Sequence, residues 1–214
     1  WMQFFLPFEL KKLKVDKLYS PMNFGPIFLK IFKINFVLAL HSNLPWVFFS
    51  KMPGNILRNK FTKFIMEKSI IACDSLIVDS YFAKKEIVDL MKIKDEKVSV
   101  IYLGIDQKYL SPKKNDYYLD NFAYKNYIIS VLSCVKYHNI INLLKAFKLF
   151  KEGNKNNLKL VFVLQILDKK YFSEIKKFLD NNFFQNEIIF LYNLDNKYLV
   201  NLYKNANLFI FSSY

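Results

Sequence analysis

The order of apolar segments constrains the fold of this 214-residue chain more than any other feature. Short apolar runs alternate with longer segments in which apolar residues recur every three or four positions, as on one face of a helix. The short runs are rich in branched side chains, which is typical of buried strands, and occupy residues 34–40, 75–78, 98–102, 127–132, 158–164, 187–191 and 207–211. Strands that alternate with helices in this way predict an α/β fold with parallel sheets covered by helices on both faces.

The segment QKYLSPKKNDYYLDNFAYKN, residues 107–126, interrupts the alternation because it contains a proline and mixed charges but has no sustained period. We interpret it as the linker between two doubly wound domains, with a first domain at 1–108, the linker at 109–125 and a second domain at 126–214. Ligands of such sheets bind beyond the carboxyl ends of the strands. The pattern therefore predicts where a ligand lies but not which reaction occurs.

The helical period also predicts which side chains face the core. Ser80 is the expected N-cap of one helix, and a second helix is expected to begin near Asn139. The apolar positions that we expect to point inward on the three best-defined helices are Phe61, Phe64, Ile65 and Ala72; Ala83, Ile87, Leu90 and Met91; and Ile140, Leu143, Leu144, Phe147 and Phe150.

The net charge of +14 raises the question of a nucleic-acid partner. Residues up to Leu110 include 17 basic and 10 acidic side chains, and the remainder includes 15 and 8, so each part carries +7. A charge spread this evenly does not resemble the clustered patch of a nucleic-acid-binding protein, and we expect no nucleic-acid partner. The basic amphipathic stretch at 58–69 has two interpretations: it lies against anionic lipid, or it is a solvated helix face.

Cys73 and Cys134 have neither the spacing of a metal site nor the even framework of a small disulfide-bonded protein. They therefore support neither a zinc site nor a disulfide scaffold, and we expect a reducing, cytoplasmic setting. Lysine and serine residues interrupt the most apolar region before it reaches the length of a membrane span. Because the chain begins at Trp1 and stops directly after an apolar run, we expect it to be an internal part of a longer protein.

Three segments resemble family 4 glycosyltransferases of the GT-B fold. CDSLIVDSYFAKKEIVDLMKIKDEKVSVIYLGIDQKYLSP is similar to the end of that family's N-terminal domain, and YIISVLSCVKYHNIINLLKAFKLF is similar to the first strand, loop and helix of its C-terminal domain. LVNLYKNANLFIFSSY is similar to the segment before the family's paired acidic motif. The resemblance implies two Rossmann-like domains, both incomplete, with the acidic motif expected after Ser213.

The resemblance implies transfer of a sugar from a nucleotide-sugar donor to a hydroxyl of a glycan or a lipid-linked acceptor. It further implies retention of the anomeric configuration, no metal ion, and a role in cell-surface polysaccharide biosynthesis. The expected location is the cytoplasm or, for a peripheral protein, the inner face of the cell membrane. Two other classes stay open. One is a degenerate relative that binds a nucleotide or a protein partner without turnover, and the other is a basic module that binds membrane surfaces.

The resemblance also assigns residues of the first domain. His41 ends the segment FVLALH and takes the place of a histidine close to the reacting sugar; the alternative is a loop histidine satisfied by backbone partners. Four further positions are expected on the acceptor side or between the domains: Asn23, Gly25, Ser80 and Gly104.

In the second domain, aligning VLSCVKYHN with the family's phosphate loop places Leu132 at a glycine, Ser133 at an arginine and His138 at a lysine. The donors expected to hold the diphosphate are Ser133, Lys136, His138 and Asn139, together with the N-terminus of the following helix. The alternative is a surface turn without a ligand. Leu164 and Tyr192 stand where the family has glycines and are expected to crowd the donor, whereas Ser212 and Ser213 are expected at the edge of its site.

Overall fold

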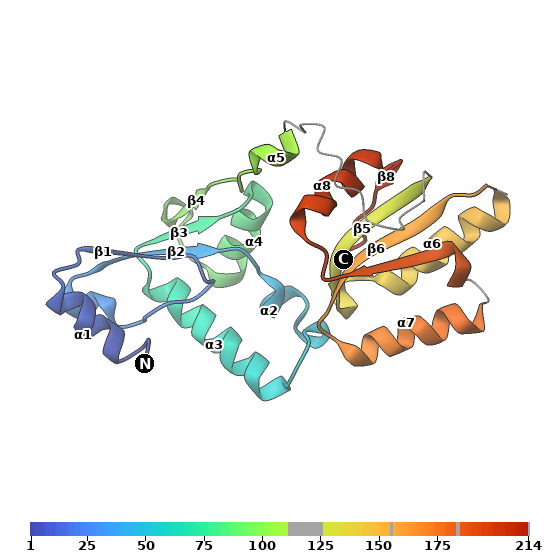
Figure 1. The fold of residues 1–214 in the computed structure, drawn as a ribbon. Helices are drawn as coiled ribbons and strands as arrows, with labels where there is room; N and C mark the ends of the chain where they lie inside the picture. Colours follow the sequence, from blue (N-terminus) through green and yellow to red (C-terminus); the bar gives the residue numbers. More distant parts are fainter. Residues whose placement is uncertain (111–125, 155, 183–184, 214) are drawn as a thin grey trace. The chain divides into compact units, whose positions relative to one another are not determined.

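The structure is a computed structural model that describes residues 1–110, 126–154, 156–182 and 185–213 (Figure 1). Its contacts divide the chain into an N-terminal unit, Trp1–Ser50 with Gly54–Gly104, and a C-terminal unit, Lys51–Pro53 with Ile105–Tyr214. The first unit thus ends at Gly104, a few residues before the predicted boundary at 108. Apart from its first two residues, the predicted linker at 109–125 lies outside the described residues.

The N-terminal unit is built on a four-stranded parallel sheet with the order β1-β2-β3-β4. Its strands are β1 (Lys17–Ser20), β2 (Asn35–Leu40), β3 (Ser75–Val78) and β4 (Val98–Val100). Its helices are α1 (Phe5–Lys12), α2 (Leu44–Val47), α3 (Ile56–Ala72) and α4 (Tyr81–Met91), with 3-10 turns η1 (Leu29–Phe32), η2 (Phe49–Lys51) and η3 (Asp95–Lys97). Side chains of β2, β3, α3 and α4 form one core that includes Phe36, Leu38, Ile70, Leu76 and Ile87.

The C-terminal unit has a second four-stranded parallel sheet, with the order β7-β6-β5-β8. Its strands are β5 (Tyr127–Cys134), β6 (Lys159–Ile166), β7 (Ile188–Tyr192) and β8 (Leu208–Phe209). Its helices are α5 (Gln107–Leu110), α6 (Ile140–Gly153), α7 (Lys169–Asn181) and α8 (Asn196–Asn205), with 3-10 turns η4 (Lys136–His138) and η5 (Gln185–Glu187).

This second sheet is covered on both faces (Figure 1). One core joins β5 and β6 to α6 and α7 through side chains such as Phe162, Leu144 and Ile175. A separate core joins the other face of the same strands to α8 through Ile129 and Leu202. The two cores confirm the predicted α/β class and the doubly wound arrangement of this unit.

The predicted strands are all present within two residues at each end, and Ser80 caps α4 by accepting a hydrogen bond from the Ala83 N–H at 3.1 Å. Strand β1 and helices α1, α2 and α5 were not predicted. The expected burial was wrong for Phe61, Phe64, Leu90 and Phe150, which are 65%, 49%, 46% and 40% exposed.

Helix α3 explains the first two of these errors. Its buried side chains are Asn59, Met66, Ser69 and Ile70, so the buried face of the helix includes two polar residues. The Ser69 hydroxyl accepts from the Gly25 N–H at 3.0 Å and lies 3.1 Å from the Gly25 carbonyl oxygen. A Cβ at Gly25 would lie 2.5 Å from the Phe36 ring, so the residue must be glycine for β2 and α3 to pack.

Candidate functional site

A cavity of about 500 Å³ opens at the carboxyl ends of three neighbouring strands in the C-terminal unit. Its lining comes from the ends of β5 and β6, from η4 and from the segment after β7: Val131, Leu132, Ser133, His138, Val163, Leu164, Gln165, Asn193 and Leu194. The cavity lies where ligands of such sheets are expected to bind, beyond the carboxyl ends of the strands. The cavity has an apolar floor and a small set of polar groups, as ligand sites commonly do.

The backbone before His138 differs from the predicted loop. Strand β5 continues through Ser133 and Cys134, and Ser133 pairs in register with Gln165 of β6. Ser133 therefore lies on the strand and reaches the cavity from there, not from the following turn. The chain then makes the short turn η4, which places the His138 ring over the end of β5.

His138 is the ionisable side chain among the described residues that line the cavity. Its Nδ1 lies 2.6 Å from the carbonyl oxygen of Ser133. Because a carbonyl can only accept, Nδ1 carries the proton, and Nε2 of the neutral ring has a lone pair. The ring is held between two aromatic rings, Tyr137 at 4.5 Å and Phe211 at 5.2 Å between centroids. A second proton on the ring would make Nε2 a cationic donor.

The other predicted diphosphate ligands are placed differently. Lys136 does not line the cavity, and its Nζ lies 3.7 Å from Glu174 of α7. Asn139 adopts a left-handed conformation, with φ 56°, before α6, and its Oδ1 accepts from the Asn142 side chain at 2.9 Å. The N–H of Ile141 in the first turn of α6 donates to the Tyr171 hydroxyl at 3.3 Å. The structure thus brings together Ser133 and His138 but not Lys136 and Asn139.

Ser212 and Ser213 attach the C-terminal segment to the same turn. The Ser212 hydroxyl donates to the His138 carbonyl oxygen at 2.7 Å, and the Ser213 hydroxyl donates to that of Tyr137 at 3.3 Å. Both serines therefore lie beside the cavity's ionisable group. Of the two residues expected to crowd the donor, Leu164 lines the cavity and is 2% exposed, whereas Tyr192 does not line it.

In the N-terminal unit, three polar residues follow the ends of three adjacent strands. Asn23 follows β1, His41 follows β2 and Asp79 follows β3. His41 Nδ1 lies 2.9 Å and 3.1 Å from the two carboxylate oxygens of Asp79, so the ring is held by a side chain and not by backbone partners. The His41 N–H donates to Asn23 Oδ1 at 2.6 Å. A carboxylate on Nδ1 fixes the tautomer and leaves Nε2 as the ring atom that a ligand meets.

Three further residues of this unit were predicted to have functional roles: Gly25, Ser80 and Gly104. Gly25 is required by the close approach of Phe36, and Ser80 is the N-cap of α4. A Cβ at Gly104 would meet no atom within 4 Å. Their expected acceptor-side or interdomain roles stay predictions.

Sequence reasoning missed Gln165, Asn193 and Asp79. Each lies one or two residues after the end of a predicted strand, and polar residues at that position are the signal that could have identified them. Within the described ranges no three His, Cys, Asp or Glu side chains gather as a metal site would require.

Burial raises the pKa of the Cys134 thiol to about 12, with a smaller contribution from Asp168, so this buried thiol stays protonated.

A family model and several solved structures match this chain. Residues 119–214 match the family model described as glycosyl transferases group 1. A glycosyltransferase from Rickettsia africae has a TM-score of 0.68 at 19% identity, and the match covers 98% of this chain and 54% of that one. The chain has the GT-B fold. None of the curated protein sequences matches it significantly.

Two further solved structures share the GT-B fold. HepE from Anabaena, in a complex with UDP-glucose, has a TM-score of 0.73 at 14% identity over 97% of this chain. Sucrose-phosphate synthase from Thermosynechococcus elongatus has a TM-score of 0.71 at 15% identity over 98%. The matches cover 56% and 53% of those two proteins, so this chain spans about half the length of its structural neighbours. No helix in the described part of the chain has both the length and the apolar character of a membrane span.

Proposed function

We propose that this chain is part of a glycosyltransferase that takes a sugar from a nucleoside diphosphate donor. The observation that carries the proposal is the cavity at the strand ends of β5, β6 and β7, in which His138 presents a ring nitrogen beside the hydroxyl-bearing Ser133. Structural neighbours that share this fold are described as complexes with UDP and with UDP-glucose. A diphosphate in the cavity would meet a polar edge and an apolar floor.

The proposed chemistry requires charge stabilisation on the departing diphosphate as the glycosidic bond breaks. His138, once protonated, donates from Nε2 to a phosphate oxygen, and the Ser133 hydroxyl supplies a neutral donor. Gln165 and Asn193, which also line the cavity, are placed to contact the nucleoside or the sugar. We further propose that His41 acts near the sugar, because Asp79 holds its Nδ1 and leaves Nε2 to accept a hydrogen bond from a hydroxyl group.

The proposal also includes the stereochemistry, the acceptor, the metal requirement and the cellular setting. We infer retention of configuration, an acceptor hydroxyl on a glycan or a lipid-linked molecule, and catalysis without a metal ion. The cytoplasmic face of the cell membrane and cell-surface polysaccharide synthesis are the setting that we propose, since an activated nucleotide sugar and a lipid-linked acceptor meet there.

The experiment is a turnover assay with a panel of uridine and adenosine diphosphate sugars. Nucleoside diphosphate release is measured with and without lipid-linked and free glycan acceptors. We expect release from one donor, acceptor-dependent acceleration, and a loss of turnover in His41→Ala that leaves nucleotide binding unchanged. Absence of both nucleotide binding and release would refute the proposal.

A second candidate is a relative that binds the nucleotide without turning it over. The observation that favours it is the lack of any lysine or arginine among the described residues that line the cavity. Loss of two charge-assisted contacts, at about 1.5 to 3 kcal/mol each, would slow a transferase by about two to four orders of magnitude. Binding of a nucleoside diphosphate with no detectable release from any donor would support this candidate.

A further inference from the structure

The turn that carries His138 is held from two directions. Within the turn, the His138 N–H donates to the Val135 carbonyl oxygen at 3.1 Å, and Nδ1 lies 2.6 Å from the carbonyl oxygen of Ser133. From outside the turn, the Ser212 hydroxyl donates to the His138 carbonyl oxygen at 2.7 Å. The Phe211 ring lies 5.2 Å from the His138 ring, at an angle of 63° between their planes. Ser212 and His138 are 74 positions apart, so only the fold brings them together.

Phe211 is not part of the hydrophobic cores of the described residues. Its side chain is 51% exposed, and it belongs to none of the three clusters of buried apolar side chains. The adjacent Ile210, in contrast, packs against the core that includes side chains of α6 and α7. Half-exposed aromatic side chains are common on protein surfaces, but the ring of Phe211 meets the ring of a residue that lines the cavity. Its role is therefore to be sought at His138.

The sheet fixes Phe211 relative to the cavity. Strand β8 pairs in parallel with β5, and the Ile210 N–H donates to the Ile129 carbonyl oxygen at 2.9 Å. The other end of β5 contributes to the lining of the cavity. Tyr137, whose ring lies 4.5 Å from that of His138, is the preceding residue and moves with the turn. Of these two aromatic neighbours, Phe211 is the one that ties the imidazole to the sheet.

The orientation of the imidazole decides what a ligand meets. Nδ1 is committed to the Ser133 carbonyl oxygen, so the atom left for a phosphate oxygen is Nε2. The torsion between Cβ and the ring of a histidine has broad energy minima, so an unsupported ring turns easily. Such a turn would lengthen the bond to Ser133 and move Nε2. The surroundings of His138 must therefore hold the plane of its ring.

We propose that Phe211 and Ser212 are positioning residues that hold His138 with Nε2 toward the diphosphate. Ser212 fixes the backbone of the turn through its bond to the His138 carbonyl oxygen, and Phe211 packs against the ring and holds its plane. Neither residue lines the cavity, so both act through His138. The inference rests on the proposed function, because the group that they orient is the one assigned to the diphosphate.

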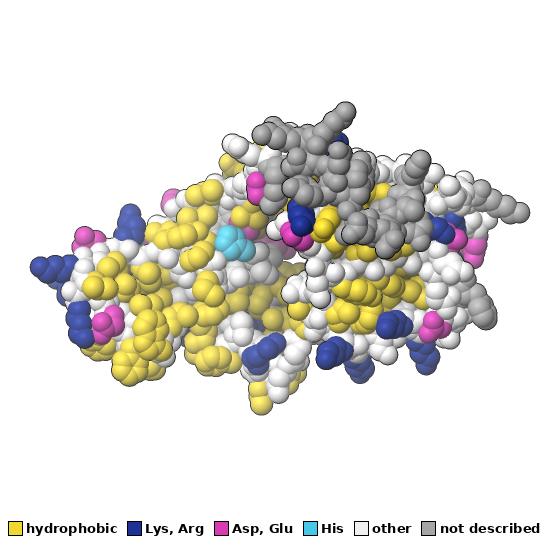
Figure 2. Space-filling model, in the orientation of Figure 1, with side chains coloured by type: hydrophobic (Ala, Val, Ile, Leu, Met, Phe, Trp, Pro, Cys, Tyr) yellow, Lys and Arg dark blue, Asp and Glu magenta, His cyan; other side chains and the backbone are white. Residues whose placement is uncertain are grey.

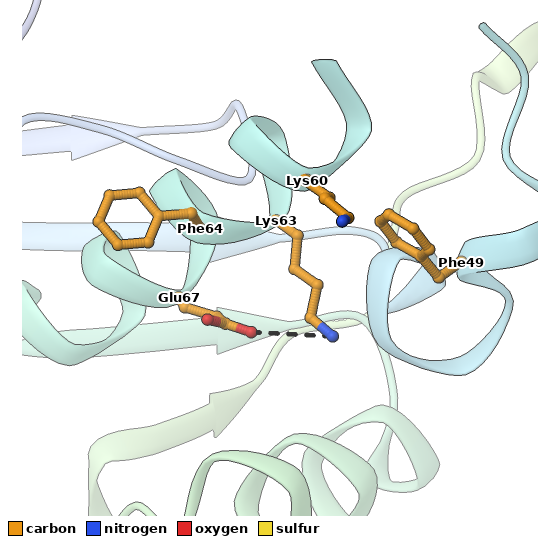
Figure 3. Close-up of a pocket in the computed structure, with 5 residues that line it drawn as sticks. All are labelled: Phe49, Lys60, Lys63, Phe64 and Glu67. Carbon is orange, nitrogen blue, oxygen red and sulfur yellow. Dashed lines mark ion pairs between the residues drawn. The ribbon is translucent and has the colours of Figure 1, made fainter. Parts of the chain in front are cut away.

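Charge alone is the competing explanation for binding of a diphosphate. The chain has a net charge of +14, and in Figure 2 lysine and arginine side chains are scattered over the visible surface. Figure 3 shows a groove of about 240 Å³ on α3, where Lys60 and Lys63 lie with Phe49, Phe64 and Glu67. The Lys63 ammonium lies 4.0 Å from Glu67, so Lys60 is the better anchor for an anion. Binding in this groove would depend on Lys60 and not on the His138 ring.

The first measurement is affinity, by isothermal titration calorimetry with uridine and adenosine diphosphate. Loss of an aromatic contact or of one hydroxyl–carbonyl bond should weaken binding by about 2- to 10-fold in each of Phe211→Leu and Ser212→Ala. The conservative variants Phe211→Tyr and Ser212→Thr keep the ring and the hydroxyl, and they should bind like the original chain. The charge variant Lys60→Gln should change the dissociation constant by less than about twofold.

Two matched controls remove similar contacts elsewhere. Phe209→Leu removes a ring that is 47% exposed and lies 5.4 Å from the ring of Tyr203. Ser20→Ala removes a hydroxyl that donates to the Phe24 carbonyl oxygen at 2.7 Å in the N-terminal unit. Both controls lose a contact of the same kind as the positioning variants but leave the surroundings of His138 intact. They should bind either diphosphate like the original chain.

The second measurement observes the imidazole without a ligand. The chain has two histidines, so a proton–nitrogen correlation spectrum of the imidazoles contains two sets of signals, which His138→Ala assigns. With its ring neutral, His138 of the original chain should be protonated at Nδ1. In Phe211→Leu and Ser212→Ala, the nitrogen shifts of His138 should move toward those of a free imidazole that exchanges between its two tautomers. The signals of His41, which Asp79 holds, should stay unchanged.

The inference is overturned if the His138 signals of Phe211→Leu and Ser212→Ala match those of the original chain. It is also overturned if the matched controls weaken binding as much as these variants, or if Lys60→Gln causes the larger loss. If the original chain binds neither diphosphate, the proposed function fails, and the imidazole spectrum alone then decides whether the two residues position His138.

Discussion

His138 should control the affinity of the cavity for a nucleoside diphosphate. Its Nδ1 is committed to the Ser133 carbonyl oxygen at 2.6 Å, so Nε2 is the atom that meets a phosphate oxygen. A charge-assisted hydrogen bond contributes about 1.5 to 3 kcal/mol, which corresponds to about 10- to 150-fold in a dissociation constant. We therefore expect His138→Ala to weaken binding of uridine or adenosine diphosphate by a factor in that range.

Lys136 provides the matched control because it belongs to the same turn but does not line the cavity. Its ammonium lies 3.7 Å from Glu174, and both side chains are more than 40% exposed. Lys136→Ala should therefore change the dissociation constant by no more than about threefold, the scale of an exposed ion pair. Isothermal titration calorimetry of the three proteins with each diphosphate measures the difference.

The variant His138→Lys separates charge from ring geometry. A lysine supplies a cationic donor without the imidazole ring, so binding should persist in this variant if a charged donor at position 138 is what the diphosphate requires. The reasoning is refuted if His138→Ala binds as tightly as the original chain, or if Lys136→Ala causes the larger loss.

Three further predictions concern stability and reactivity. Phe162 is fully buried, so Phe162→Ala should lower the free energy of unfolding by about 3 to 5 kcal/mol in urea denaturation, whereas Phe82→Ala, at a 71% exposed position, should change it by less than about 1 kcal/mol. Burial raises the pKa of Tyr127 to about 12, so between about pH 10 and 12 the folded state keeps a proton that the unfolded state loses. The free energy of unfolding should therefore fall by up to about 1.4 kcal/mol per pH unit over this range. The variant Tyr127→Phe should lack this fall. Burial also raises the pKa of the Cys73 and Cys134 thiols, and a thiol reagent should modify both only after unfolding; rapid modification of the native chain would contradict the buried positions.

The alternation of apolar runs and helical segments was sufficient to predict most of the fold. Strands β5 and β6 are buried on both faces over most of their length and therefore leave continuous apolar runs in the sequence. Strand β1 has alternating exposed and partly buried residues over four positions, which is too short for its period to be recognised. Helix α1 buries only Pro7, and its apolar residues are largely exposed, so they do not indicate which face packs.

Errors in predicted burial arose where a polar group was required in the core. Helix α3 buries Ser69, whose hydroxyl accepts a hydrogen bond from the Gly25 N–H. With this face buried, Phe61 and Phe64 are exposed to solvent. A pattern that counts apolar positions assigns the opposite face. The information that decides it is a contact between residues 44 positions apart.

The candidate site was predictable in part for a similar reason. The resemblance pointed to Ser133 and His138, and both line the cavity because they lie at or close to the end of β5. Lys136 and Asn139 are equally close in the sequence, but the turn η4 directs Lys136 toward Glu174, and Asn139 bonds to Asn142. Gln165 and Asn193 reach the cavity from other strands, and only the parallel pairing of β5, β6 and β7 brings them beside Ser133.

The most direct test of the central claim is a crystal structure of the chain with bound uridine or adenosine diphosphate. The account predicts density for the diphosphate in the cavity at the ends of β5, β6 and β7, with a phosphate oxygen within hydrogen-bonding distance of His138 Nε2. A diphosphate bound elsewhere on the C-terminal unit, or a His138 ring whose Nε2 points away from it, would contradict the account.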